Sequence, residues 1–121
     1  MAEIQMGVIE TQFAEMIWEL EPVSSSELVK LTADRFTWKR TTCHNVLRRL
    51  CDKGIFRNDN GTVSSLISRQ EFFSMQSRRY VEETFDGSLP AFIAAFTKGG
   101  TLTAEEAAAI RRMIDEAEEV Q

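Results

Sequence analysis

The sequence is poor in the residues that build metal centres, disulfides and common catalytic sites. Its 121 residues include one histidine and two cysteines, and neither a glycine-rich phosphate loop nor a nucleophile elbow is present. Cys43 and Cys51 fall in one predicted helix and lie about 12 Å apart along its axis, which is too far for a disulfide. We therefore expect no metal, no cofactor and no enzymatic activity, with both thiols buried and reduced.

Long apolar runs are also missing. No stretch of about 18 apolar residues exists, and the amino end, Met-Ala-Glu-Ile-Gln-Met, lacks the basic start of a signal peptide. The composition, 43% hydrophobic and 27% charged, is typical of a soluble globular protein. These features predict a cytoplasmic location.

Basic residues are scarce outside one segment. The chain carries 14 Lys and Arg against 19 Asp and Glu, a net charge of −5. Residues 30–57 hold eight of the basic residues against Asp34 and Asp52 only, whereas residues 1–29 hold six acidic residues and no basic one. This division favours nucleic-acid binding by the basic segment. The alternative is a solvated basic face without a ligand.

Two helices are predicted before the basic segment. The first covers 10–20, because its apolar residues recur at helical spacing: Phe13, Met16, Ile17 and Leu20. Pro22 ends it, and Val23 follows as one extended residue. Ser24 and Glu27 match a capping box that opens a second helix, which closes by position 35 or 36.

A third helix and a hairpin are predicted next. Residues 39–53 carry one apolar stripe, formed by Cys43, Val46, Leu47 and Leu50. Gly54 fits a left-handed cap, and strands at 55–57 and 62–67 flank a connection that ends in Asn-Gly, a strong hairpin signal. The fold class is therefore mainly α with a small β-hairpin wing: a winged-helix (helix-turn-helix) DNA-binding domain over 1–68, followed by a helical domain.

The remaining residues, 69–121, are predicted to form three helices that dimerise. Helices are expected at 69–85 and 88–97, and a last one begins at the capping box of Thr103 and Glu106. Their apolar side chains exceed what three short helices can cover, so a second copy is expected to bury them. The alternative is a monomer folded back on the first domain. The expected dimerisation residues are Phe72, Phe73, Tyr80, Phe85, Leu89, Phe92, Ile93, Phe96, Ile110, Met113 and Ile114.

The polar side of the third helix suits duplex DNA. Short polar and basic side chains near a helix start can reach base edges, while Lys and Arg hold phosphates. The expected base contacts are Thr41, His44, Asn45 and Arg48. The expected backbone contacts are Lys39, Arg40, Thr42, Arg49, Lys53 and Arg57. Trp38 is expected to pack on the first helix rather than on DNA, because large aromatics entering a helix usually anchor it.

Segment 37–54 contains a Trp, a Thr four residues later and then Leu-x-Arg-Leu-x-x-Lys-Gly, ending at Gly54. This pattern resembles the recognition helix of the penicillinase-repressor (BlaI/MecI/CopY) family. The similarity extends to Phe-Asp-Gly-Ser-Leu at 85–89 and Leu-Thr-Ala-Glu-Glu at 102–106. It therefore spans nearly the whole chain.

The resemblance implies a homodimer that binds palindromic operators and dimerises through its C-terminal helices. In antibiotic-responsive members a membrane-bound sensor protease triggers cleavage before a Phe, which here is the Ala95–Phe96 bond, with Ala95 in place of the family's Asn. The tail lacks the Cys-x-Cys motifs of copper-responsive members, which excludes metal sensing by that route. Arg40 replaces a usual Pro and adds a phosphate contact, and the wing lacks the Arg and Tyr often found on its returning strand.

We therefore expect a repressor that binds double-stranded operator DNA as a homodimer. The rival hypothesis is a winged-helix protein-interaction module that does not bind DNA. A third is a small-molecule sensor with its ligand between the C-terminal helices. Selection of duplexes from a random pool separates the first two, because only a DNA reader returns a motif.

Overall fold

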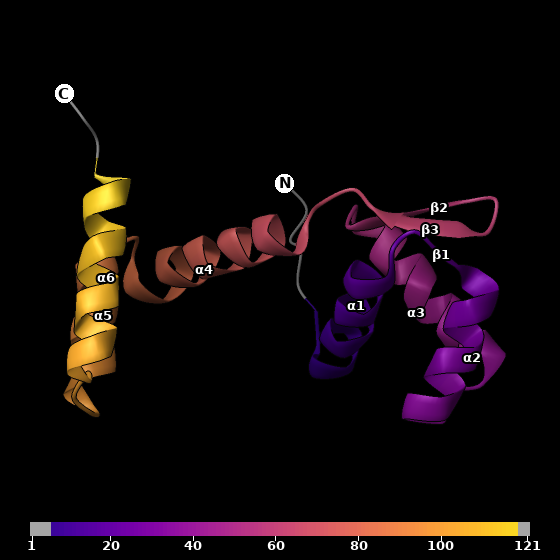
Figure 1. Ribbon diagram of the computed structural model, residues 1–121, viewed down its shortest axis with the longest axis horizontal. Coiled ribbons are helices and arrows are strands. Elements are labelled where there is room, and N and C mark those ends of the chain that lie inside the picture. The colour runs from indigo at the N-terminus through magenta and orange to yellow at the C-terminus, as the bar shows by residue number, and fades with distance from the viewer. Residues whose placement is uncertain (1–5, 119–121) are drawn as a thin grey trace. The chain divides into compact units, whose positions relative to one another are not determined.

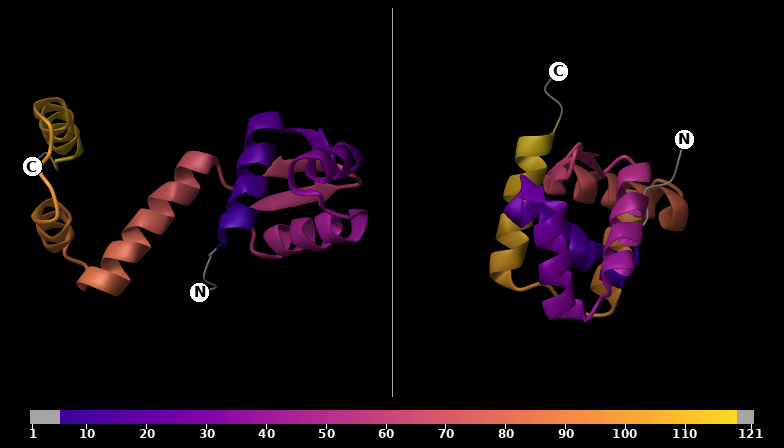
Figure 2. Two further views of the ribbon diagram at one scale, coloured as in Figure 1. Left: turned by 90° about the horizontal axis from the view of Figure 1, so that it is seen from below. Right: turned by 90° about the vertical axis from the view of Figure 1, so that its right-hand side faces the viewer.

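The computed structural model describes residues 6–118 and divides into two compact units, one up to Arg78 and one from Arg79. The first unit contains helices α1 (Val8–Leu20), α2 (Ser25–Phe36) and α3 (Arg40–Asp52), with three strands. These three helices lie on one side of the sheet (Figure 1), and the view from below shows them in front of it (Figure 2). The predicted helices, the hairpin and the mainly α winged-helix class are confirmed.

The turns between these helices follow from local chemistry. The Ser24 hydroxyl accepts a hydrogen bond from the Glu27 amide at 3.1 Å, which caps the start of α2. At its end Thr37 adopts a left-handed conformation, φ 55°, which stops the helix. Gly54 does the same after α3 with φ 82°, as its position in the sequence predicts. The direction in which α3 leaves α2 is therefore set by Thr37.

The sheet has the order β1-β3-β2 and is antiparallel throughout. Strands β2 (Phe56–Asp59) and β3 (Thr62–Ser65) form the wing, joined by Asn60–Gly61. Both of these residues have positive φ, 51° and 92°, as a type I′ turn requires. The predicted strand limits are wrong by up to two residues, because the two-residue turn leaves Asn58 and Asp59 inside β2.

A third strand was not predicted. Val23, expected as a single extended residue, begins β1 (Val23–Ser24), whose residues pair with Val63 and Thr62 of β3. The sheet therefore ties the segment between α1 and α2 to the wing.

One apolar core holds the first unit together. Its side chains come from all three helices, the sheet and the start of α4: Phe13, Ala14, Met16, Ile17, Val23, Leu28, Cys43, Val46, Leu47, Leu50, Ile55, Phe56, Val63 and Phe72. The Trp18 ring packs against two phenylalanine rings: its centroid lies 5.3 Å from that of Phe56 and 5.6 Å from that of Phe72. The first turns of α4 therefore belong to the core of the first unit, the head of the molecule.

The second unit contains the rest of α4 (Arg69–Phe85), α5 (Leu89–Lys98) and α6 (Ala104–Ala117). The capping box of Thr103 and Glu106 is confirmed, with both hydrogen bonds at 3.0 Å. Ser68 and Glu71 form a second such box at the start of α4, with bonds of 3.2 and 3.0 Å. This capping box was not predicted, although its Ser-x-x-Glu pattern is present in the sequence.

Apolar side chains of the second unit remain uncovered. Between residues 79 and 118 no described side chain is buried. Exposed fractions reach 64% for Phe96 and 63% for Met113. Large exposed apolar side chains of this kind are typical of surfaces that contact another molecule.

Phe72 differs from the other expected dimerisation residues. Its side chain is 3% exposed and lies against Trp18 in the first unit, so it is removed from the proposed dimer surface. The predicted boundary between 68 and 69 coincides with the start of α4, whereas the compact units divide after Arg78. That boundary stays a prediction.

Candidate nucleic-acid interface

Helices α2 and α3 form a helix-turn-helix whose second helix is anchored by Trp38. The Trp38 ring lies 5.3 Å from that of Phe13 and 5.0 Å from that of Phe36, measured between centroids. The preference for core packing is confirmed, since the ring joins α1 to the end of α2. The position of α3 in the first unit is thus fixed from its first residue.

The predicted apolar stripe of α3 is confirmed: Cys43, Val46, Leu47 and Leu50 are all buried. Successive helical residues turn by about 100°, so the polar side chains around this stripe divide into three rows. One row faces away from the core, one borders the wing and one borders α1. The predicted DNA contacts here, seven in α3 and two at the flanking Lys39 and Lys53, are therefore not equivalent.

The outward row holds Thr41, Asn45, Arg48 and Asp52, and all four are exposed. The hydroxyl, carboxamide and guanidinium groups of the first three are the chemistry that reads base edges. Asp52 ends the row with a carboxylate, which repels phosphate. The amino-terminal part of α3 is therefore the part suited to enter a groove.

The row beside the wing contains His44 and Cys51. With Leu47, Arg48 and Asn58 of β2 they line a hollow of about 300 Å³. His44 is half-buried, in contrast to the other three predicted base contacts. Burial, and to a lesser degree the neighbouring Asp52 charge, raise the pKa of the Cys51 thiol above its ordinary value.

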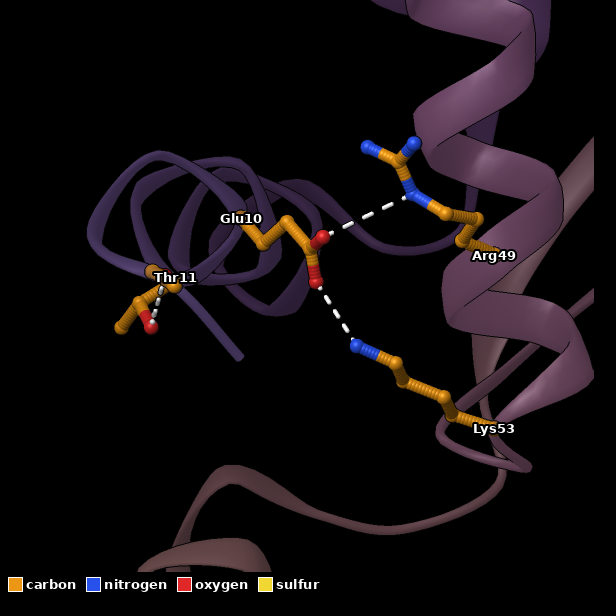
Figure 3. A network of polar contacts seen from close by, with 5 residues as sticks. Glu10, Thr11, Arg49 and Lys53 are labelled. Atoms are coloured by element: carbon orange, nitrogen blue, oxygen red, sulfur yellow. Dashed lines mark hydrogen bonds and ion pairs between the residues drawn. The ribbon is translucent and has the colours of Figure 1, made fainter. Parts of the chain in front are cut away.

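The row beside α1 contains Arg49 and Lys53, both predicted to hold phosphates. Their charged groups instead meet one carboxylate of α1, as Figure 3 shows: Lys53 Nζ lies 2.9 Å from Glu10 Oε2, and Arg49 Nε lies 3.5 Å from Glu10 Oε1. Sequence reasoning missed Glu10, because a pairing across more than thirty residues leaves no local periodic signal. Glu10 would therefore compete with DNA phosphates for the two cations that were predicted to contact the DNA backbone.

The other predicted backbone contacts surround the outward row. Lys39, Arg40 and Arg57 are exposed, and Thr42 is half-buried in the first turns of α3. Lys39 precedes α3 without a side-chain cap, so the first amides of that helix have no side-chain acceptor there. Backbone amides of this kind donate hydrogen bonds to a bound anion.

The wing tip carries negative charge, in contrast to the positive charge around α3. The turn residues Asn60 and Gly61 are uncharged, and Asp59 beside them is exposed. Only Arg57, further back on β2, adds a cation to the wing. The positive charge of the head is therefore concentrated on α3 and its borders.

Other kinds of site find little support in the described part of the chain. Among residues 6–118 no group of three His, Cys, Asp or Glu side chains is arranged to hold a metal ion. Within the same range, no helix has both the length and the apolar character needed to cross a bilayer.

A helix-turn-helix followed by a two-stranded wing, with an exposed polar row on its second helix, defines a winged-helix protein. The sequence model of one family, the penicillinase repressors, matches residues 6–116. The chain belongs to the penicillinase repressor family, a family of transcriptional regulators rather than enzymes. The resemblance seen in the sequence is thereby confirmed. Comparison with curated proteins gave no match.

Proposed function

We propose that this protein is a cytoplasmic, sequence-specific transcriptional repressor that binds a palindromic operator as a homodimer. The observation that carries the proposal is the outward row of α3, which presents three base-reading side chains on a helix whose opposite face is fixed in the core. A helix so held enters the major groove as one rigid reader.

Each side chain of the row has a matching base chemistry. The Arg48 guanidinium suits the two acceptors of guanine, the Asn45 carboxamide suits adenine, and the Thr41 methyl suits thymine. His44 stands beside the row, where its half-buried ring supports a contact at the edge of the site. Arg48 and Asn45 are therefore the main specificity residues of the proposal.

Phosphate contacts are proposed at both ends of the row. Lys39, Arg40 and Thr42 flank its start, and Arg57 extends from β2. Free amides at the start of α3 add donors for the same phosphates. Arg49 and Lys53 contribute less to phosphate binding, because Glu10 neutralises part of their positive charge.

Dimerisation is proposed through the apolar side chains of the C-terminal helices. The proposed residues are Phe73, Tyr80, Phe85, Leu89, Phe92, Ile93, Phe96, Ile110, Met113 and Ile114. Tyr80, Phe85 and Phe92 pack as a cluster with centroids 5.5 to 6.1 Å apart. The exposed members around this cluster give a second copy an apolar surface to bury, and a two-fold dimer presents two reading helices about 34 Å apart or a multiple of it.

Release of the operator by proteolysis is proposed at Ala95–Phe96, in response to a membrane-bound sensor protease. Both residues are exposed on α5. Cleavage there would cut one of the three helices of the proposed dimer surface and weaken operator binding through loss of the dimer.

The proposal is tested by selecting duplexes from a random pool and by gel shift on the DNA upstream of the gene. A palindromic motif with competition-resistant binding is expected. A pool that returns no motif would overturn the proposal and favour the protein-interaction module. Sedimentation of the free protein measures the dimer independently.

A further inference from the structure

The contact between α1 and α3 bears on how tightly the protein binds DNA of any sequence. Glu10 is the one acidic side chain that touches cations of α3 among the ion pairs of the described residues. It is not itself a DNA-binding group, since a carboxylate repels phosphate. Its effect must therefore pass through Arg49 and Lys53.

The two cations are held differently. Lys53 makes the shorter contact, 2.9 Å, and its side chain is 28% exposed. Arg49 is 58% exposed, and its Nε lies 3.5 Å from Glu10 Oε1 (Figure 3). The charge of Lys53 is thus largely compensated, whereas the outer edge of Arg49 stays available to a phosphate.

We infer that Glu10 limits the sequence-independent part of DNA binding by compensating one of the two positive charges beside the reading row. The inference rests on the proposed function. The carboxylate leaves the three-residue cluster with one net positive charge instead of two. Because non-specific affinity depends on the number of phosphates neutralised and base reading does not, the compensation lowers affinity for random DNA and leaves the contacts of Arg48 and Asn45 unchanged.

The geometry also explains why the charge is compensated here. The outward row ends in Asp52, and the wing tip carries Asp59, so the carboxyl end of this row and the wing tip both carry negative charge. An uncompensated Lys53 would add attraction to any phosphate backbone near the far end of the helix. Glu10 removes that attraction while holding α1 against α3.

The test is the Glu10→Gln variant, which keeps the side-chain shape and removes the charge. Its affinity for a non-operator duplex, measured by fluorescence anisotropy from 50 to 200 mM salt, is expected to exceed that of the wild type most at low salt. Its log–log salt slope should steepen by about 0.9 for each phosphate newly neutralised, a roughly three- to fourfold larger loss of affinity over this range. Operator affinity is expected to rise by a similar factor, because a phosphate contact carries no sequence information, so the ratio of operator to non-operator affinity should stay unchanged.

Two further variants are the controls. Glu15→Gln removes the same charge from the same helix, but Glu15 pairs with Arg69 at 2.8 Å, away from α3, so its salt slope should match the wild type. The double variant Glu10→Gln/Lys53→Met restores the net charge of the cluster and should restore the wild-type slope. Thermal melting verifies folding of each, and Glu10→Ala, which also removes the charge, provides the same test if Glu10→Gln unfolds.

The outcomes separate this inference from the proposed function. If Glu10→Gln and Glu15→Gln change the slope alike, or if Glu10→Gln weakens DNA binding, the inference is overturned while sequence selection by the wild type still stands. If the wild type shows no sequence preference but Glu10→Gln alone steepens the slope, the proposed function is overturned and the role of Glu10 in non-specific binding is upheld.

Discussion

The indole nitrogen of Trp18 donates a hydrogen bond of 3.0 Å to the main-chain carbonyl of Ile67. This bond joins the last turn of α1 to the segment that leads from β3 into α4. The same ring packs at a tilt against Phe56 and Phe72, so the wing and the start of α4 are both fixed through one side chain.

The Trp18→Phe variant is expected to lose about 1–3 kcal/mol of unfolding free energy, because the Ile67 carbonyl loses its partner in a half-buried place. Urea unfolding followed by circular dichroism measures the loss. Trp38→Phe is the matched control, since among the described residues the Trp38 ring makes stacking contacts and no hydrogen bond through its nitrogen. Equal losses in the two variants would show that the hydrogen bond contributes nothing.

Arg48→Ala is expected to relax base preference at one position of each half-site and to reduce operator affinity by about 1–3 kcal/mol. Selection from a random pool measures the preference, and gel shift measures the affinity. Arg40→Ala, which removes a cation beside the row, should weaken all sequences alike. A motif unchanged by Arg48→Ala would contradict the assignment of the outward row.

Phe96→Asp is expected to convert the dimer to a monomer, because a buried carboxylate would replace a ring that is 64% exposed in the single chain. Sedimentation velocity measures the change. Leu66→Asp is the control, since Leu66 is 56% exposed on the first unit and should leave the dimer intact. Loss of the dimer in the control alone would place the interface elsewhere.

Both cysteines are expected to react slowly with iodoacetamide at pH 8. Burial raises the pKa of the Cys43 and Cys51 thiols, and a hydrogen bond with Thr32 only partly opposes it at Cys43. A raised pKa lowers the fraction of reactive thiolate at a given pH. Mass spectrometry of Cys43→Ala isolates Cys51, whose rate should rise in urea to that of a free thiol; a native rate already at that level would refute the expectation.

Much of the head could be predicted because its signals are local. The buried stripe of α3, the Asn60–Gly61 turn and the left-handed cap at Gly54 each depend on residues within one or two turns of chain. Spacing and backbone preference suffice for such features. Even the role of Trp38 followed from the usual behaviour of aromatics at a helix start.

The remaining features depend on how distant elements dock. Strand β1 forms only because Val23 meets Val63, and the phosphate role given to Lys53 overlooked a carboxylate supplied by α1. Likewise, Phe72 belongs to the first core because Trp18 lies beside it. None of these pairings has a period or a motif, so no reading of one segment reveals them.

The tight turn of the wing bears on how the family can diversify. Asn60 and Gly61 set the turn between β2 and β3 through their positive φ, and the Asn58 side chain accepts a hydrogen bond of 2.9 Å from the Gly61 amide. Among the described residues, the exposed side chain of the neighbouring Asp59 makes no hydrogen bond or ion pair in that turn. A single codon change there alters the charge of the wing tip while α3 and the core stay as they are. Under the proposed function, evolution, or an engineer building a graded set of repressors, can thus adjust operator occupancy without redesigning recognition.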